Sequence, residues 1–394
     1  MFEFNPLSPE FQSNPYQYYR LLHEHMPMFH WELANMWFLS RYNDCVAALK
    51  DNRLGHNFDG FQSPEEQQVA LWEMQGNWML LKNPPDHTRL KTLVHKAFTP
   101  RMIEHLRVQI QQITDDLLDK VQDKGSMDLI EDLAFPLPIT VIARMLGLPL
   151  EDQERLREWS TDLAITLELI EDPEPYNKAS KVTVVVTDYL RKLVAQRRKH
   201  PTDDLISALV AAEEQGDKLT EDEMIANVIL LLIAGHETTV NLIGNGTLAL
   251  LRNPEQFEKL KNDLSLVKNA IEEMLRYDSP VQLTSRMAQQ DVEFNGQQIA
   301  RGQQVATLLG AANRDPQVFP NPDGFDITRP NAGQHIGFGN GIHYCLGAPL
   351  ARLEAEIAFS TLLRRLPTLA LTDEAPVYKG TYVLRGMKSF PVAF

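Results

Sequence analysis

The sequence predicts a mainly α protein with minor β structure, and three observations lead to this fold class. Apolar residues recur at helical spacing over most of the 394 residues, well beyond the usual third of a globular chain. Strand-like stretches are few and short. No Pro/Gly/Ser-rich linker, repeat or low-complexity tract marks a boundary, so residues 1–394 are expected to form a single domain.

Helices are predicted wherever apolar positions recur every three or four residues, and helix-start residues support some of them. Pro84 and Asp86, for example, stand where a first turn tolerates proline and favours an acid. In chain order the predicted helices are Tyr16–Met26, Tyr42–Lys50, Pro84–Phe98, Met102–Val121, Glu151–Leu169, Asn177–Arg198, Asp204–Ala212, Glu221–Arg252, Pro254–Asn262, Leu264–Arg276 and Leu346–Leu366.

Strands are predicted at Met36–Leu39, Val292–Phe294, Gln303–Leu308 and Tyr382–Arg385. The most apolar stretch, Val228–Ala234, is too short to span a bilayer, so it is predicted to belong to a buried core helix.

Charge and cysteine content predict a cytoplasmic protein without a membrane anchor. The net charge of −15 argues against nucleic acid and anionic membranes as partners. Met1–Pro15 has neither a basic region nor an apolar run, so no signal peptide or anchor is expected there. Cys45 and Cys345 are far apart in the sequence, and a reducing compartment would keep both as thiols.

The stretch from Phe338 to Gly347 combines three glycines, an aromatic ring, a histidine and a thiol. Glycine lets a backbone turn tightly and approach a flat partner. A helical pattern starts just after Cys345, and the N-terminus of a helix favours a thiolate over a thiol. A thiolate on such a loop is suited to hold a metal ion. The alternative is a buried core cysteine behind an ordinary turn.

The pattern Phe-x-x-Gly-x-x-x-Cys-x-Gly, met by Phe338, Gly341, Cys345 and Gly347, resembles the haem-binding loop of the cytochrome P-450 family. The resemblance implies a single two-lobed domain around a buried haem b. It also implies that the Cys345 thiolate is the proximal iron ligand, and that Phe338, Gly339 and Gly347 lie beside the haem.

A second motif interrupts an apolar helix with Ala234, Gly235, Glu237 and Thr238. Glycine costs about 1 kcal/mol relative to alanine inside a helix, and a threonine hydroxyl can bond to a carbonyl one turn earlier. From the residues alone, a polar notch and a helix-packing site are equal alternatives. The motif is similar to the family's (Ala/Gly)-Gly-x-(Asp/Glu)-Thr. This implies that Ala234 and Gly235 make room for dioxygen, that Thr238 orients it with a water, and that Glu237 belongs to the proton supply. His236 lies outside the motif and is predicted to be a core or pocket residue.

Glu273 and Arg276 stand one helical turn apart, and with Arg329 they match the family's structural triad. Alone, such a pair would be a surface ion pair worth about 0–1 kcal/mol. The resemblance implies instead that these three residues hold the cysteine loop.

Cations are expected near the two haem propionates. His87 and Lys91 match the family's His-x-x-x-Arg pair, although lysine replaces the usual arginine and loses its bidentate fork. Arg286 and His343 fill the remaining propionate positions by resemblance. Arg89 is predicted to be a solvated surface cation.

Three segments are expected, by resemblance, to line an apolar substrate pocket beside the haem. Gln282 and the Tyr382 hydroxyl are the polar groups expected there. Helices Glu151–Leu169 and Asn177–Arg198, joined by an acidic loop that includes Glu171, are predicted to form a lid over the pocket. The expected lining residues are Trp78, Leu80, Gln282, Leu283, Tyr382 and Val383.

Taken together, the resemblance implies a monooxygenase that inserts one oxygen atom from O2 into an apolar C–H bond. Its substrate would be of fatty-acyl, steroid, statin or macrolide type, either a free small molecule or carrier-linked. The chain contains no reductase sequence, so electrons are expected from a separate ferredoxin or flavodoxin with its reductase. Candidate docking cations are Lys91, Lys96, Arg101 and Arg352.

Two other functions are compatible with a haem-binding loop, namely a peroxide-driven peroxygenase and a non-catalytic haem sensor or carrier. The Glu237–Thr238 pair favours the monooxygenase over both.

Overall fold

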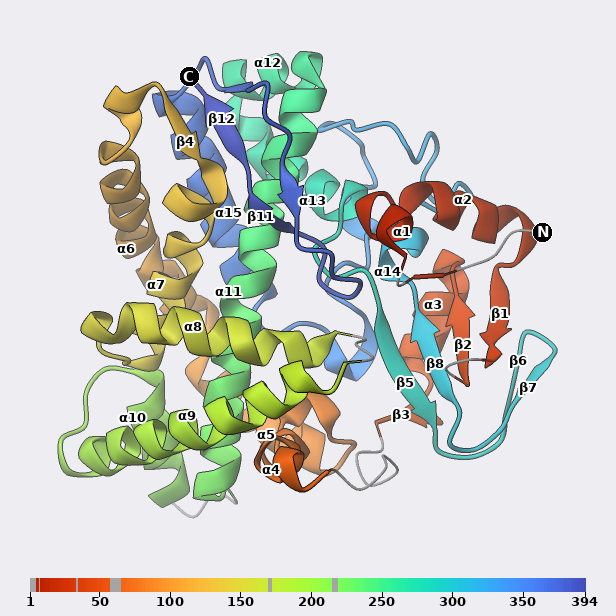
Figure 1. The fold of residues 1–394 in the computed structure, drawn as a ribbon, viewed down its shortest axis with the longest axis vertical. Coiled ribbons are helices and arrows are strands. Elements are labelled where there is room, and N and C mark those ends of the chain that lie inside the picture. Colours follow the sequence, from red (N-terminus) through yellow and green to blue (C-terminus); the bar gives the residue numbers. More distant parts are fainter. Residues whose placement is uncertain (1–4, 7, 33–34, 57–64, 169–171, 215–218) are drawn as a thin grey trace. The chain divides into compact units, whose positions relative to one another are not determined.

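The computed structural model describes residues 5–6, 8–32, 35–56, 65–168, 172–214 and 219–394 (Figure 1). The chain divides into two compact units. Met1–Gly55, Gln111–Pro136 and Thr238–Phe394 form the first, called here the sheet unit. His56–Ile110 and Leu137–Glu237 form the second, called the helical unit. Helices α6 (Pro100–Asp119) and α11 (Glu221–Arg252) each begin in the helical unit and end in the sheet unit.

The sheet unit contains a five-stranded sheet of order β1-β2-β8-β5-β3. Strands β2 and β8 are parallel, and the other neighbours are antiparallel. The β6–β7 hairpin turns at Asn295 and Gly296, both with left-handed φ (+49° and +75°), as Asn-Gly hairpin turns require. The strands of the five-stranded sheet are β1 (Met28–Trp31), β2 (Met36–Leu39), β3 (Leu54–Gly55), β5 (Thr284–Ala288) and β8 (Gln304–Thr307). The hairpin consists of β6 (Val292–Phe294) and β7 (Gln297–Ile299).

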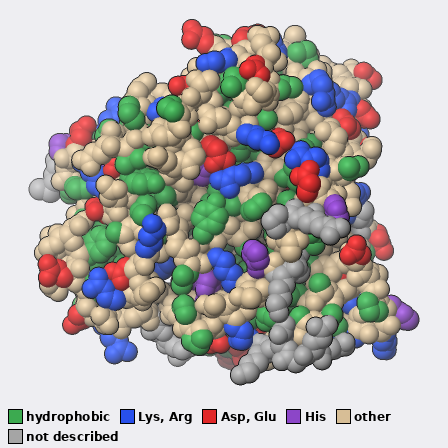
Figure 2. Space-filling model, turned by 180° about the vertical axis from the view of Figure 1, so that it is seen from behind, with side chains coloured by type: hydrophobic (Ala, Val, Ile, Leu, Met, Phe, Trp, Pro, Cys, Tyr) green, Lys and Arg blue, Asp and Glu red, His purple; other side chains and the backbone are tan. Residues whose placement is uncertain are grey.

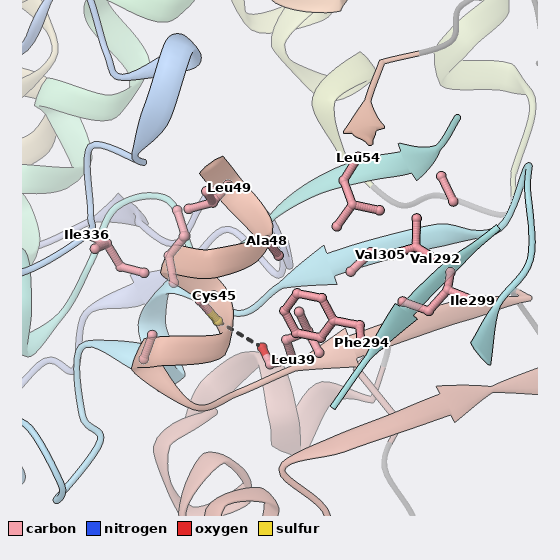
Figure 3. Packing of buried hydrophobic residues seen from close by; sticks show 13 residues of the cluster. Leu39, Cys45, Ala48, Leu49, Leu54, Val292, Phe294, Ile299, Val305 and Ile336 are labelled. Atoms are coloured by element: carbon pink, nitrogen blue, oxygen red, sulfur yellow. Dashed lines mark hydrogen bonds between the residues drawn. The ribbon is translucent and has the colours of Figure 1, made fainter. Parts of the chain in front are cut away.

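A hydrophobic core lies between this sheet and α3 (Tyr42–Lys50), as Figure 3 shows. Cys45 is fully buried in it, and its thiol donates a hydrogen bond to the Leu39 carbonyl at 3.3 Å. Burial raises the pKa of the Cys45 thiol. Ile336 packs into the same core, so the core also holds the chain just before the cysteine loop.

The remaining elements of the sheet unit are mostly helices. Helix α13 packs on α15. A three-stranded sheet joins β4 (Ser126–Asp128), β12 (Pro391–Ala393) and β9 (Ala370–Leu371), and β10 (Val377–Tyr378) pairs with β11 (Met387–Ser389). The helices are α1 (Pro9–Ser13), α2 (Tyr16–His25), α12 (Pro254–Asn262), α13 (Val267–Tyr277), α14 (Leu309–Ala312) and α15 (Ala348–Arg365).

The helical unit has no strand among its described residues. Helix α9 packs on α4, α8 and α10. Its helices are α4 (Val69–Gly76), α5 (Asp86–Ala97), α7 (Pro136–Leu146), α8 (Gln153–Ala164), α9 (Glu174–Lys199) and α10 (Leu205–Glu214).

Helix α11 is long and apolar enough to cross a membrane, but 83% of its most apolar window is buried inside the protein. It is therefore a core helix, as predicted for Val228–Ala234.

The mainly α fold class is confirmed, and α3, α11, α12, β2 and β6 have the predicted bounds. The predicted strand Tyr382–Arg385 is wrong. There the chain makes only an isolated bridge, Val281 to Leu384, because two backbone hydrogen bonds to residues 280–282 are too few for a strand. The helix at Pro136–Leu146 was not predicted from the sequence, because its β-branched residues obscure the helical pattern. Leu169, the predicted end of one helix, lies outside the described residues.

Candidate functional site

The cysteine loop, Phe338–Gly347, depends on two glycines. Gly339 and Gly341 have φ of +72° and +70°, in the left-handed region that other residues rarely adopt. A Cβ on Gly341 would also overlap the carbonyl oxygen of Leu49 at the end of α3. The Cys345 N–H donates to the Phe338 carbonyl at 3.0 Å, which closes the loop. Cys345 thus lies three residues before α15 and is half-buried.

A buried ion network holds the chain that precedes this loop. Glu273 and Arg276 on α13 are fully buried, and Arg329 is 6% exposed. The Glu273 carboxylate accepts hydrogen bonds from Arg276 (2.7 and 2.8 Å), from Arg329 (3.1 and 3.2 Å) and from the Asp326 N–H (2.9 Å). The two arginines also donate to backbone carbonyls of Asn313, Pro320, Asn321, Pro322 and Gly324.

Two further side chains hold the backbone directly before the loop, and the sequence analysis missed both. Asn313 accepts the Ile336 N–H at 2.7 Å. His335 accepts the Gly337 N–H on Nδ1 at 3.0 Å. Neither residue stands in a short motif, so only their proximity in the fold reveals the role.

Helix α11 is buried along most of its length but has one exposed position. Ala234 is the single exposed residue between Met224 and Leu250, and Gly235 and Thr238 beside it are half-buried. Ala234 and Thr238 are one turn apart, so they share a helix face. This exposed surface on an otherwise buried helix leaves room for another group to lie against it.

His236 and Glu237 are buried instead. His236 donates from Nδ1 to the Leu232 carbonyl at 3.0 Å, its Nε2 is 3.4 Å from Ser160 Oγ, and it lies 3.8 Å from Glu237. A Cβ on Gly235 would come within 2.9 Å of Ile142, so glycine here also lets α7 pack closely. His236 is therefore a core residue, which is one of the two roles predicted for it, the other being a pocket residue.

Arg286, on β5, is a buried guanidinium with no carboxylate partner among the described residues. It donates to the Thr284 hydroxyl at 3.2 Å and to the Ser285 carbonyl at 2.7 Å. Burial lowers its pKa to about 10. A buried cation without an acid is costly, so this site fits an anionic group of a bound molecule.

The other predicted propionate residues have different exposures. His87 is buried and Lys91 half-buried on α5 of the helical unit, whereas His343 is half-buried in the sheet unit. Arg89 is an ion-paired residue, bonded to Glu223 at 2.6 and 3.0 Å and to Asp86 at 3.1 Å, and is only half-buried. It is therefore held by acids rather than simply solvated.

The sequence profile of the family described as Cytochrome P450 matches residues 4–391. The chain belongs to the cytochrome P450 family. It is 44% identical over 390 residues to the biotin biosynthesis cytochrome P450 of Bacillus subtilis (strain 168), covering 98% of each chain. It is 41% identical over 392 residues to the vitamin D(3) 25-hydroxylase of Pseudonocardia autotrophica, covering 98% of this chain and 95% of the relative.

The fold agrees with that membership. The structure of P450BioI in complex with hexadec-9Z-enoic acid-ligated acyl carrier protein matches with a TM-score of 0.93. The match covers 98% of this chain and 100% of that one at 43% identity. The protein is thus a cytochrome P450 monooxygenase, an oxidoreductase with a haem-iron cofactor.

The residues of this P450 fit such a cofactor. In the sheet unit, Gly339 and Gly341 turn the cysteine loop tightly, and Cys345 is half-buried three residues before α15. Arg286, in the same unit, is a buried cation with no carboxylate partner among the described residues. A thiol that can ligate iron and a buried cation that can meet a propionate suit an iron porphyrin.

The expected substrate-lining residues of this P450 are mostly buried. Gln282, however, is held within the protein: its amide donates to the Ser279 carbonyl at 2.7 Å and accepts from the Tyr19 hydroxyl at 2.8 Å. This argues against Gln282 as a polar contact for substrate. Trp78, Leu283 and Tyr382 are buried, and Leu80 and Val383 are half-buried. The Tyr382 ring packs against Phe11 at 5.2 Å.

Proposed function

We propose that this P450 binds haem b through the Cys345 thiolate and hydroxylates a mostly apolar substrate with dioxygen. The observation that carries the proposal is the position of Cys345, on a loop closed by left-handed glycines before α15. When bound, the haem supplies the iron that binds and activates oxygen. The chain's own residues hold it, exclude water and manage protons.

The roles of α11 follow from its open stretch. We infer that Ala234 and Gly235 leave space, and that the Thr238 hydroxyl orients a water by a hydrogen bond. Glu237 is buried and can pass protons between the interior and this water. We infer that His87, Lys91, Arg286 and His343 hold the propionates, and that Phe338, Gly339 and Gly347 contact the ring.

For the substrate, we favour a mostly apolar molecule of fatty-acyl, steroid or macrolide size that is neutral or carrier-linked. One relative's structure contains a fatty acid on an acyl carrier protein, and another relative is named as a vitamin D(3) hydroxylase, so apolar molecules of this size suit the fold. Trp78 and Leu80 offer apolar contact. Titrating the ferric protein with the carrier-protein thioester of hexadecenoic acid and with vitamin D3 should give a low- to high-spin shift with at least one of them, and a larger shift than the free, anionic acid gives. A shift with small polar compounds alone would contradict this substrate class.

We infer that electrons come from a separate ferredoxin or flavodoxin with its reductase, and that the protein acts in the cytoplasm. Two cysteines that form no disulfide and a buried α11 are compatible with that compartment. A peroxide-driven reaction is the alternative. Turnover with an electron donor and dioxygen should exceed turnover with peroxide alone, and the reverse would favour a peroxygenase.

The test of haem ligation compares the two cysteines. Cys345→Ala should lose the red-shifted Soret band of the reduced carbon-monoxide complex, because that band requires a thiolate ligand. Cys45→Ala is the matched control and should keep the band, since Cys45 lies in the hydrophobic core. Survival of the band in Cys345→Ala would overturn the proposed function.

A further inference from the structure

Glu272 lies on α13 directly before Glu273 of the triad, yet its carboxylate reaches other partners. Oε1 accepts a hydrogen bond from Arg352 Nε at 2.6 Å, and Oε2 accepts from Arg352 Nη2 at 2.9 Å. Oε2 also lies 3.1 Å from His335 Nε2. Burial alone would raise the pKa of Glu272, but the bonds from Arg352 and His335 outweigh it and lower the pKa to about 2. The carboxylate is therefore ionised near neutral pH.

Arg352, on α15, carries the opposite charge against the cysteine loop. Its guanidinium carbon lies 4.6 Å from the ring centroid of Phe338, a cation–π contact, and Nη1 is 3.3 Å from the Tyr344 hydroxyl. The hydrogen bond to Glu272 raises the pKa of Arg352. Arg352 was expected to be a docking cation, but its charge is already taken up by Glu272.

His335 connects Glu272 to the start of the loop. Because its Nδ1 accepts the Gly337 N–H, the ring proton is on Nε2 and is donated to Glu272. Burial lowers the pKa of His335, which keeps the ring neutral in this arrangement. Glu272 is thus connected through His335 to the backbone directly before the loop, and through Arg352 to the ring of Phe338 in the loop.

We propose that Glu272 is a positioning residue of the cysteine loop, which holds Arg352 on Phe338 and His335 on Gly337 and neutralises the charge of Arg352 near Cys345. The inference rests on the proposed function, because it concerns the thiolate that would bind haem. One-electron reduction adds negative charge at the haem. An unneutralised cation nearby favours reduction, and an unneutralised anion opposes it. The pair is only partly exposed, at 34% for the Arg352 and 18% for the Glu272 side chain, so solvent screens it incompletely.

The experiment measures the midpoint reduction potential of the haem-loaded protein. Glu272→Gln keeps the size of the side chain and an oxygen that can accept from His335, but leaves Arg352 unneutralised. Its potential should shift to more positive values. Arg352→Gln should shift it to more negative values, and the double variant should return toward the wild-type potential. Control variants are Glu258→Gln and Lys261→Gln, which break an ion pair of 2.5 Å on α12 and change net charge equally.

Opposite shifts, each larger than that of its control, would support the inference. Equal shifts in pair and control, or shifts of one sign in both single variants, would overturn it, because a purely structural contact would disturb the loop alike in either variant. If Glu272→Gln does not take up haem, the inference is tested by comparing the potential shift of Arg352→Gln with that of Lys261→Gln. A more negative shift in Arg352→Gln supports it, and an equal shift overturns it. A wild-type protein without the red-shifted Soret band would refute the proposed function instead, independently of these shifts.

Discussion

At the scale of single residues, Glu354 on α15 is a buried acid that the proposed chemistry does not use. It is fully buried, and neither carboxyl oxygen meets hydrogen-bond geometry with a described residue. Burial raises its pKa to about 8, and the nearby Thr239 hydroxyl, which favours the charged form, offsets this only in part. The carboxyl is therefore neutral in the folded protein at pH 7.

Glu354 should make stability fall as pH rises. In the unfolded chain the group ionises near its ordinary pKa of 4.5, whereas in the folded protein it keeps its proton to about pH 8. The folded state binds more protons between these values, so the free energy of unfolding decreases across that window by several kcal/mol. Glu354→Gln should abolish this decrease. Urea midpoints from pH 5 to pH 9 provide the measurement, and parallel curves for variant and wild type would contradict it.

Thr238 offers a second prediction at this scale. Thr238→Ala removes the hydroxyl at the open stretch of α11, so electrons should be consumed with more peroxide and less product. Thr238→Ser keeps the hydroxyl and should restore most of the coupling. Product formed per electron is the quantity to measure, and an unchanged ratio in Thr238→Ala would remove Thr238 from the proposed mechanism.

At the scale of elements, the close packing of α11 depends on glycines. A Cβ on Gly246 would lie 2.7 Å from Met274 Sδ on α13 and 2.8 Å from Phe359 Cζ on α15. A Cβ on Gly244 would meet mainly the end of the flexible Ile130 side chain, at 2.9 Å. The two glycines belong to the same helix, but only Gly246 faces a rigid ring.

Gly246→Ala should therefore destabilise the protein more than Gly244→Ala. Both variants gain about 1 kcal/mol of helix propensity, whereas overpacking costs about 1–3 kcal/mol and is hardest to relieve against a ring. Urea unfolding followed by circular dichroism gives the two midpoints. A lower midpoint for Gly244→Ala would show that Phe359 and Met274 yield more easily than Ile130.

At the scale of the whole molecule, charge is abundant but mixed. The chain carries a net charge of −15, and on the face drawn in Figure 2 the Lys and Arg side chains are interspersed with Asp and Glu. Of the predicted docking cations, Arg352 is bound by Glu272, and the side chains of Lys96 and Arg101 lie outside the described residues. The electron-donor surface therefore remains a prediction.

The salt dependence of reduction tests the contribution of Arg352. Reduction by an acidic ferredoxin should slow as salt is added, because screening weakens attraction to a local basic area. The double variant Glu272→Gln/Arg352→Gln should leave the slope of rate against salt no more altered than Glu258→Gln/Lys261→Gln does, since each removes an ion pair without changing the net charge. Stopped-flow reduction rates supply the slopes, and a flattened slope in the Glu272/Arg352 double variant alone would make Arg352 a docking residue.

The sequence by itself determined the mainly helical fold class, the bounds of α3 and α11, and the glycine-rich cysteine loop. These features depend on residue type and local spacing. Glycine adopts the left-handed φ of Gly339 and Gly341 with the least strain, and helical periodicity needs no distant partner. Only the tertiary structure decided that Pro136–Leu146 is helical, that Gln282 is held by Tyr19, and that Glu272 and His335 support the loop. Their partners are far away in the sequence, and burial or long-range hydrogen bonding, rather than local preference, determines what each of them does.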